Sequence, residues 1–161
     1  MPLRRTRKPR ADAAARKLPP TALAVDRILD ANINRAREGL RVAEEVARLA
    51  LSCGSLQAEC KRLRHGVTAA ERALPGVSPL RGRDAGRDPG AGGRRPRAFA
   101  RATWQDLARA NLRRAQEALR VLEEVSHLKS PSVSRRFQRL RFHAYELESR
   151  LIRRLTFAAG K

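Results

Sequence analysis

Asparagine, arginine and glutamate recur in this chain at three-residue steps, and the same set appears twice. A guanidinium group donates paired hydrogen bonds to oxyanions, a carboxamide both donates and accepts, and a carboxylate orients an arginine or accepts from an amino group. These residue types in one pattern therefore predict a site for a polar ligand. The first set is Asn32, Arg35 and Glu38, and the second, 79 positions later, is Asn111, Arg114 and Glu117.

The two sets belong to a longer repeat. Residues 28–49, ILDANINRAREGLRVAEEVARL, match residues 107–128, LARANLRRAQEALRVLEEVSHL, at 12 of 22 positions. Repeated apolar residues would show only that two helices pack alike. Repeated polar residues indicate that a polar arrangement was duplicated too, and such arrangements carry chemistry more often than cores do. The other repeated charged pairs are Arg41/Arg120, Glu44/Glu123 and Glu45/Glu124.

A helical projection of the first copy places its polar set against an apolar stripe. Asn32 and Arg35 fall inside the apolar arc, and Glu38 lies at its margin. The second copy repeats these positions. We therefore expect the asparagines and arginines of both copies to be embedded among apolar neighbours. Glu44 and its twin Glu123 point away from the arc, and we expect them to be solvated.

Two interpretations of the embedded set remain open. An unpaired buried amide costs about 1–3 kcal/mol, and a lone buried charge costs more. In the first interpretation, Arg35–Glu38 and Arg114–Glu117 are structural ion pairs that fix the helix register. In the second, the two sets face each other across a pseudo-twofold cleft and bind a polar ligand. Duplication of the whole set favours the second interpretation.

Four amphipathic segments must position these residues. Apolar side chains recur at helical spacing, and Thr103 with Asp106 is a suitable helix start. The sequence FQRLRFHAYELESRL matches CKRLRHGVTAAERAL with an offset of 77, so the repeated unit is a whole helical hairpin. Two hairpins predict an all-α, pseudo-twofold four-helix bundle. The predicted helices cover about residues 21–51, 56–74, 103–128 and 133–157.

Two further segments flank or interrupt these helices. We expect a disordered basic tail at 1–20 and a single helical domain at 21–158. Within that domain, repeat one spans 24–75 and repeat two spans 103–157. The connecting loop, 76–100, is rich in glycine, proline and arginine.

This central loop has two interpretations. It is a flexible linker between hairpins, or its length marks it as a functional loop. Glycines allow backbone N–H groups to approach phosphates, and the carboxylates of Asp84 and Asp88 suit Mg²⁺. The loop lacks the GxxxxGK[ST] pattern of a P-loop.

Composition narrows the classes of protein. The net charge of +20 attracts polyanions such as nucleic acid, anionic lipid or nucleotide phosphates, and does not choose among them. Cys53 and Cys60 lack metal-ligand spacing; we expect Cys60 in the core and Cys53 in a turn. Because no apolar run has membrane-spanning length and no signal-peptide core is visible, we expect a cytoplasmic protein without a membrane association.

The two copies of AN-x-x-RA-x-E-x-LRV-x-EEV, each followed by a KRLRH-like or QRLRF-like helix, resemble a known family. It is the small helical hydroxymethylpyrimidine-phosphate kinase family of thiamine biosynthesis, which also occurs as the N-terminal domain of fused thiamine-phosphate synthases. The resemblance covers about residues 24–155. It implies ATP-dependent phosphorylation of hydroxymethylpyrimidine phosphate to the diphosphate that thiamine-phosphate synthase consumes. The loop run GRDAGRDPG matches the family pattern at Arg83, Asp84, Asp88 and Gly90, and departs from it at Ala85 and Pro89.

With this resemblance, each candidate residue receives a hypothetical role. Arg35 and Arg114 clamp phosphate oxygens as catalytic residues, and Glu38 and Glu117 orient them or contact an amino group. Asn32 and Asn111 read the aminopyrimidine edge. Asp84 and Asp88 hold Mg²⁺ alongside ATP. Further positive charge for substrate binding comes from Arg41, Arg120, Lys61 and Arg64.

Two other classes of function stay open. One is a non-catalytic accessory domain that binds thiamine precursors and associates with a separate thiamine-phosphate synthase, and the altered loop supports it. The other is a basic helical nucleic-acid-binding protein, which charge alone supports and which lacks a recognisable module. A homodimer is compatible with each of these classes.

Overall fold

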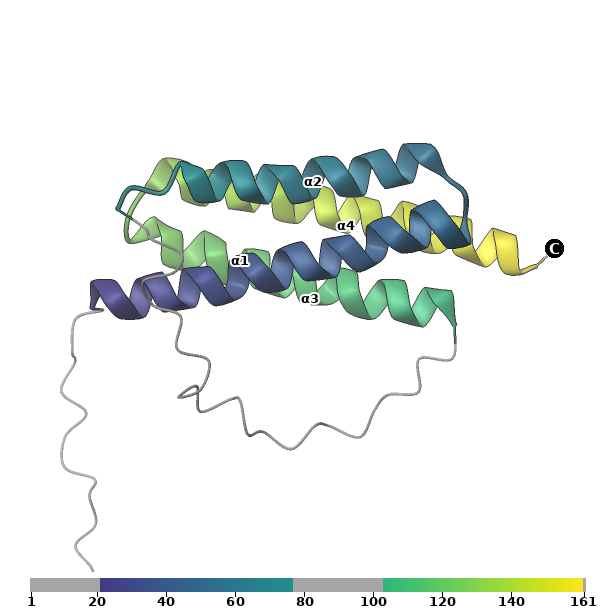
Figure 1. The fold of residues 1–161 in the computed structure, drawn as a ribbon, viewed down its shortest axis with the longest axis horizontal. Coiled ribbons are helices and arrows are strands. Elements are labelled where there is room, and N and C mark those ends of the chain that lie inside the picture. Colours follow the sequence, from purple (N-terminus) through teal and green to yellow (C-terminus); the bar gives the residue numbers. More distant parts are fainter. Residues whose placement is uncertain (1–20, 77–102, 161) are drawn as a thin grey trace, which may run out of the picture.

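Four long helices make up most of the chain that the computed structural model describes, residues 21–76 and 103–160. No strand occurs in these two ranges, so the prediction of an all-α bundle is confirmed (Figure 1). The tail at 1–20 and the loop from residue 77 onward, with Asp84 and Asp88, lie outside the described residues. The helices are α1 (Ala22–Glu45), α2 (Gly54–Arg72), α3 (Trp104–His127) and α4 (Pro131–Ala159), and a π-helical turn, η1 (Val46–Ala50), extends α1.

The helices form two antiparallel hairpins that pack side by side. Helix α1 packs against α2 and α3, and α4 packs against the same two helices. Figure 1 shows α1 and α3 next to each other and running in opposite directions. Because α3 repeats α1 and α4 repeats α2, an approximate twofold axis relates the two hairpins.

Side chains at the helix starts explain where the helices begin. The Thr21 hydroxyl accepts a hydrogen bond from the Ala24 backbone N–H at 3.2 Å. Thr103 accepts from the N–H of Asp106 at 3.1 Å and donates to its carboxylate at 2.7 Å, as the sequence predicted. Helix α4 begins two residues before the predicted start, because Ser130 caps it and Pro131 suits a first turn.

The core lies along the predicted apolar seams. The apolar residues that recur along α2 and just after it are all buried, which confirms the place of Cys60 in the core: Leu56, Cys60, Leu63, Val67, Ala70 and Leu74. Along α4 the corresponding residues are buried, except Leu140, which is half-buried: Val133, Phe137, Leu140, Ala144, Leu147 and Leu151. Cys53 precedes α2 as its N-cap residue, in the predicted turn.

Helices α1 and α3 approach each other closely at Gly39. A Cβ atom at this position would lie 2.4 Å from the backbone carbonyl oxygen of Asn111 and 3.2 Å from Cβ of Ala115. These two residues are the twins of Asn32 and Ala36 in the first copy. The helices therefore cross at the repeated segment itself, which brings the two polar sets to one place.

The first hairpin departs from the prediction at its connection. The sequence predicted a single helix to about residue 51, but α1 ends at Glu45 and the five residues of η1 follow. The offset between copies falls from 79 in the first helix to 77 in the second, so this connection is two residues longer than its twin. A π-helical turn, followed by Ser52 at a positive φ of 49°, accommodates the extra length.

Candidate functional site

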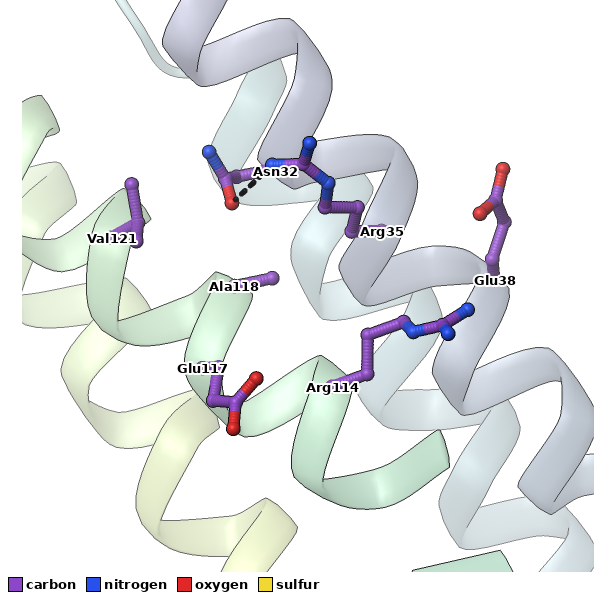
Figure 2. A pocket seen from close by; sticks show the side chains of 7 residues that line it. All are labelled: Asn32, Arg35, Glu38, Arg114, Glu117, Ala118 and Val121. Carbon is purple, nitrogen blue, oxygen red and sulfur yellow. Dashed lines mark hydrogen bonds between the residues drawn. The ribbon is translucent and has the colours of Figure 1, made fainter. Parts of the chain in front are cut away.

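A pocket of about 570 Å³ lies between α1 and α3, where the two polar sets meet. Five of the six residues of the two polar sets line it, and the sequence predicted that these two sets face each other. Asn111 is the exception: it is buried, and its backbone carbonyl oxygen lies against Gly39 of α1. Figure 2 shows Arg35 turned back toward Asn32 and Arg114 reaching from α3 toward α1. The lining residues are Asn32, Arg35, Glu38, Arg114, Glu117, Ala118 and Val121.

The charged lining residues are more exposed than the sequence predicted. Arg35 and Arg114 are exposed, whereas the helical projection placed them among apolar neighbours. Helix α3 covers the Gly39 side of α1 and leaves the Arg35 side open, so a long arginine reaches solvent past the apolar seam. The expectation of embedded arginines was therefore wrong, although all four charged side chains line one pocket.

These charged side chains also do not pair with one another. Arg35 Nη1 donates to Asn32 Oδ1 at 3.4 Å. Within the described residues, Glu38, Arg114 and Glu117 make no hydrogen bond or ion pair, so the interpretation as register-fixing Arg–Glu pairs finds no support there. Two guanidinium groups and two carboxylates thus remain available to a ligand.

The two asparagines are buried as predicted, and both side chains are fixed in the same way. Asn32 Nδ2 donates to the carbonyl oxygen of Ile28, and Asn111 Nδ2 to that of Leu107, each at 2.8 Å. The amide nitrogen is therefore engaged with its own helix. In Asn32 this holds Oδ1 at the pocket as an acceptor.

Glu44 and Glu123 correct a prediction, since both are buried rather than solvated. Glu44 accepts from Arg64 Nε at 3.0 Å, and Glu123 accepts from Arg141 Nε at 2.9 Å. The projection considered one helix alone and omitted the partner helix that covers this face. The hydrogen bond that Arg141 donates to Glu123, and then the one that it donates to the Tyr145 hydroxyl, raise the pKa of Arg141 above its ordinary value.

This pairing gives several predicted binding residues a structural contact. Arg64 ties α2 to α1 through Glu44. Arg41 pairs with Glu45 at 2.6 Å, and Arg120 pairs with Glu124 at 2.7 Å, along their own helices. None of these three arginines lines the α1–α3 pocket. Lys61 is exposed on α2 and does not line it either.

A further repeated contact went unnoticed in the sequence. Arg37 Nη1 donates to Glu71 at 3.0 Å between α1 and α2. At the twin positions, Gln116 Nε2 donates to Glu148 at 2.6 Å between α3 and α4. The two glutamates recur at the 77-residue offset of the second helices. The repeated glutamate was therefore the feature of the sequence from which this contact could have been predicted.

No metal site is visible in the ranges 21–76 and 103–160, where no three histidine, cysteine or acidic side chains gather as ligands. The predicted Mg²⁺ ligands Asp84 and Asp88 lie beyond those ranges. The described site therefore offers cationic, anionic and amide groups without a metal cluster. Such a set suits a small ligand that combines an oxyanion with an amino group.

Comparisons with known proteins place this chain among relatives with similar sequences. The model of the ThiD2 family matches residues 27–150. The chain is 44% identical over 128 residues to a protein of Nostoc punctiforme named thiamine-phosphate synthase, covering 80% of this chain and 35% of that protein. A protein of the same name in Synechocystis sp. is 43% identical over 134 residues, covering 83% of this chain and 37% of that protein.

The chain thus spans about a third of the length of these relatives. No solved structure matches it significantly. None of the helices that the structure describes has the length and apolar character to cross a bilayer. On the strength of the match to its family model and of these relatives, the chain belongs to the ThiD2 family.

Proposed function

We propose that the chain acts in thiamine biosynthesis and that its α1–α3 pocket binds hydroxymethylpyrimidine phosphate for phosphorylation by ATP. One observation carries the proposal. Two arginines and two glutamates from the duplicated segment converge on one pocket and leave each other unpaired. The family membership and the names of the relatives support the pathway.

The pocket groups suit the two ends of such a substrate. Arg114 and Arg35 bind the phosphate, because a planar guanidinium donates two parallel hydrogen bonds to its oxygens. Glu38, Glu117 and Asn32 Oδ1 are acceptors for the ring amino group. Ala118 and Val121 offer apolar surface to the ring.

Phosphoryl transfer needs little else from the protein. An oxygen of the bound phosphate forms a bond to the γ-phosphorus of ATP, the bond from that phosphorus to the bridging oxygen breaks, and ADP leaves. Catalysis of this reaction rests on positioning and charge neutralisation, which the arginines supply. Mg²⁺ supplies further charge neutralisation when bound, and its candidate ligands Asp84 and Asp88 fall outside the described residues.

A second candidate function is a non-catalytic domain that binds the pyrimidine phosphate beside a thiamine-phosphate synthase. The relatives support it directly, since they carry that name and are about three times as long as their match to this chain. The two candidates share the pocket and differ in turnover.

A coupled assay separates them. Purified protein is mixed with Mg²⁺, ATP and the pyrimidine monophosphate, and ADP release is followed together with formation of the diphosphate. Calorimetry measures binding of the monophosphate without ATP. Binding with turnover supports the kinase, binding without turnover supports the accessory domain, and the absence of both rejects the pocket assignment.

Replacing Arg114 with alanine tests the pocket residues. We expect turnover, or binding if no turnover exists, to fall on the order of a hundredfold, because one oxyanion donor is lost. We expect the melting temperature to stay within about 2 °C, since exposed side chains without partners contribute little to stability. Arg135→Ala, an exposed arginine at the start of α4, is the matched control and should retain full activity.

A further inference from the structure

A second hollow lies on the other side of α3, between α3 and α4. It consists of two adjoining pockets of about 380 Å³ and 410 Å³, and Tyr145 lines both of them. We call this hollow the Tyr145 groove. Its volume falls in the range of small-molecule sites. The arginines that line it are Arg109, Arg113, Arg120 and Arg153.

Tyr145 is held in place although 42% of it is exposed. Arg141 Nη1 donates to the Tyr145 hydroxyl at 3.1 Å, and the Arg141 guanidinium carbon lies 5.7 Å from the centre of the ring. Arg141 is in turn fixed by its bond to buried Glu123. An aromatic ring that is fixed and still open to solvent is suited to stacking with a planar ligand.

The groove carries more positive than negative charge. Four arginines line it against two carboxylates, Glu117 and Glu148, and one of the four, Arg120, pairs with Glu124 on its own helix. Arg109 has no hydrogen-bond or ion-pair partner within the described residues, and Arg113 Nε comes only within 3.9 Å of Glu148. Arginines without close carboxylate partners are available to an anionic ligand.

The duplication supplies an internal comparison. The twins of Arg109 and Arg113 in the first hairpin are Asp30 and Asn34, and the twin of Tyr145 is Thr68. The pocket between α1 and α3 uses residues that both copies keep. The Tyr145 groove instead depends on three residues that differ from their twins, Arg109, Arg113 and Tyr145, so this basic and aromatic character occurs on one hairpin only.

The groove lies next to the first pocket. Glu117 lines both, and on α3 it stands between Arg113 and Arg120 of the groove and next to Arg114 of the pocket. A phosphate chain that follows the groove toward Glu117 therefore ends beside the proposed pyrimidine-phosphate pocket. Proximity of this kind is what transfer between two bound phosphates requires.

We propose that the Tyr145 groove binds a nucleoside polyphosphate, with the base stacked on Tyr145 and the phosphates along Arg113. This assignment rests on the proposed phosphoryl transfer, for which it provides the donor site. A planar base and a polyanionic chain match an aromatic ring flanked by guanidinium groups.

Calorimetry with two probes tests the two halves of the groove. The full-length protein is titrated with ATP and, separately, with inorganic tripolyphosphate. Tyr145→Ala should weaken ATP binding between about fivefold and a hundredfold and leave tripolyphosphate binding unchanged, because only ATP has a base to stack. Arg113→Ala should weaken both probes by about tenfold or more. Arg72→Ala, which removes an exposed arginine at the end of α2, should change neither.

The results distinguish the groove from the proposed function. If the wild type, Tyr145→Ala and Arg113→Ala bound ATP with equal affinity, the assignment of the groove as a nucleotide site would be wrong. It would also be wrong if the wild type bound no ATP. The same holds if a random single-stranded oligonucleotide binds the groove more tightly than ATP does. ATP binding with the expected dependence on these residues, but without transfer to the pyrimidine phosphate, would support the groove and reject the kinase. Turnover with an unchanged KM for ATP in both variants would reject the groove alone.

Discussion

At the residue scale, two adjacent glutamates have separate roles although both are repeated. The Glu123 side chain is 9% exposed and bonds Arg141 across two helices, whereas the Glu124 side chain is 60% exposed and pairs with Arg120 on its own helix. We expect Glu123→Ala to destabilise the protein by about 1.5–3 kcal/mol, because it removes the charge-assisted hydrogen bond between α3 and the half-buried Arg141. Chemical denaturation measures the change.

Glu124→Ala is the matched control for this substitution. Its exposed pair contributes less than about 1 kcal/mol, so stability should change little. If both variants were equally stable, Glu123 would not tie α3 to α4. The same comparison applies to Glu44 and Glu45 in the first copy.

The two cysteines should differ in reactivity. Burial, and then the charges of Glu44 and Glu59, raise the pKa of the Cys60 thiol to about 12. The Ser55 hydroxyl and then the Leu56 backbone N–H lower the pKa of Cys53 below its ordinary value. We expect iodoacetamide at pH 7.5 to modify Cys53 in the native protein and spare Cys60, as read by peptide mass spectrometry.

The direction of the Cys60 shift also predicts a pH effect. A pKa raised on folding means that the folded protein binds this proton more tightly. Its contribution to stability is intact below the ordinary thiol pKa of about 9 and is lost as pH rises toward 12. Cys60→Ala should therefore lose less stability over this window than the wild type does. Rapid labelling of Cys60 in the native state would contradict its burial.

At the element scale, the contact between α1 and α3 depends on Gly39. Alanine favours a helix by about 1 kcal/mol over glycine. A Cβ here would nevertheless lie 2.4 Å from a backbone oxygen of α3, which can move only with its helix. We expect Gly39→Ala to lower the free energy of unfolding by about 1–3 kcal/mol, measured by urea denaturation, and to weaken ligand binding by shifting the pocket wall.

Gly66 in α2 is the control for that substitution. A Cβ there would approach Cδ2 of Leu140 at 2.7 Å, but this atom is the end of a flexible, half-buried side chain that can rotate away. Gly66→Ala should therefore be close to neutral. Equal effects at both glycines would show that helix propensity, and not the α1–α3 contact, decides the result.

The helices themselves were largely predictable, and the exceptions have local causes. Apolar spacing located all four, and Thr103 with Asp106 marked a start that the structure confirms. The π-helical turn was not predicted, because the apolar residues Val46 and Ala47 continue the helical spacing of α1. This spacing does not reveal whether the backbone hydrogen bonds follow the α-helical or the π-helical pattern. The only sign of it in the sequence is the fall of the offset between the two copies from 79 to 77, which shows that the first hairpin connection is two residues longer than the second.

At the scale of the whole molecule, the duplication made the bundle and the meeting of the two polar sets predictable. Exposure was less predictable, since it depends on which neighbour covers each face. Arg35 was expected inside and is exposed, while Glu44 was expected outside and is buried. A projection of one helix contains no information about the helix beside it. The Tyr145 groove was invisible for the same reason, because its residues come from two helices that diverged from their twins.

The same architecture predicts that neither hairpin folds alone. Residues with no exposed surface, such as Leu29, Leu40, Leu112 and Leu119, lie on the helices where the hairpins meet. A chain of about 60 residues is marginal even with its core intact, and each fragment would expose half of this one. We expect residues 21–76 and 103–160, made separately, to show low helicity by circular dichroism at micromolar concentration. Mixing them should restore the helical signal with one-to-one stoichiometry, because the twofold-related surfaces fit each other. A single hairpin with full helicity as a monomer would show instead that the two halves are independent units joined by their connection.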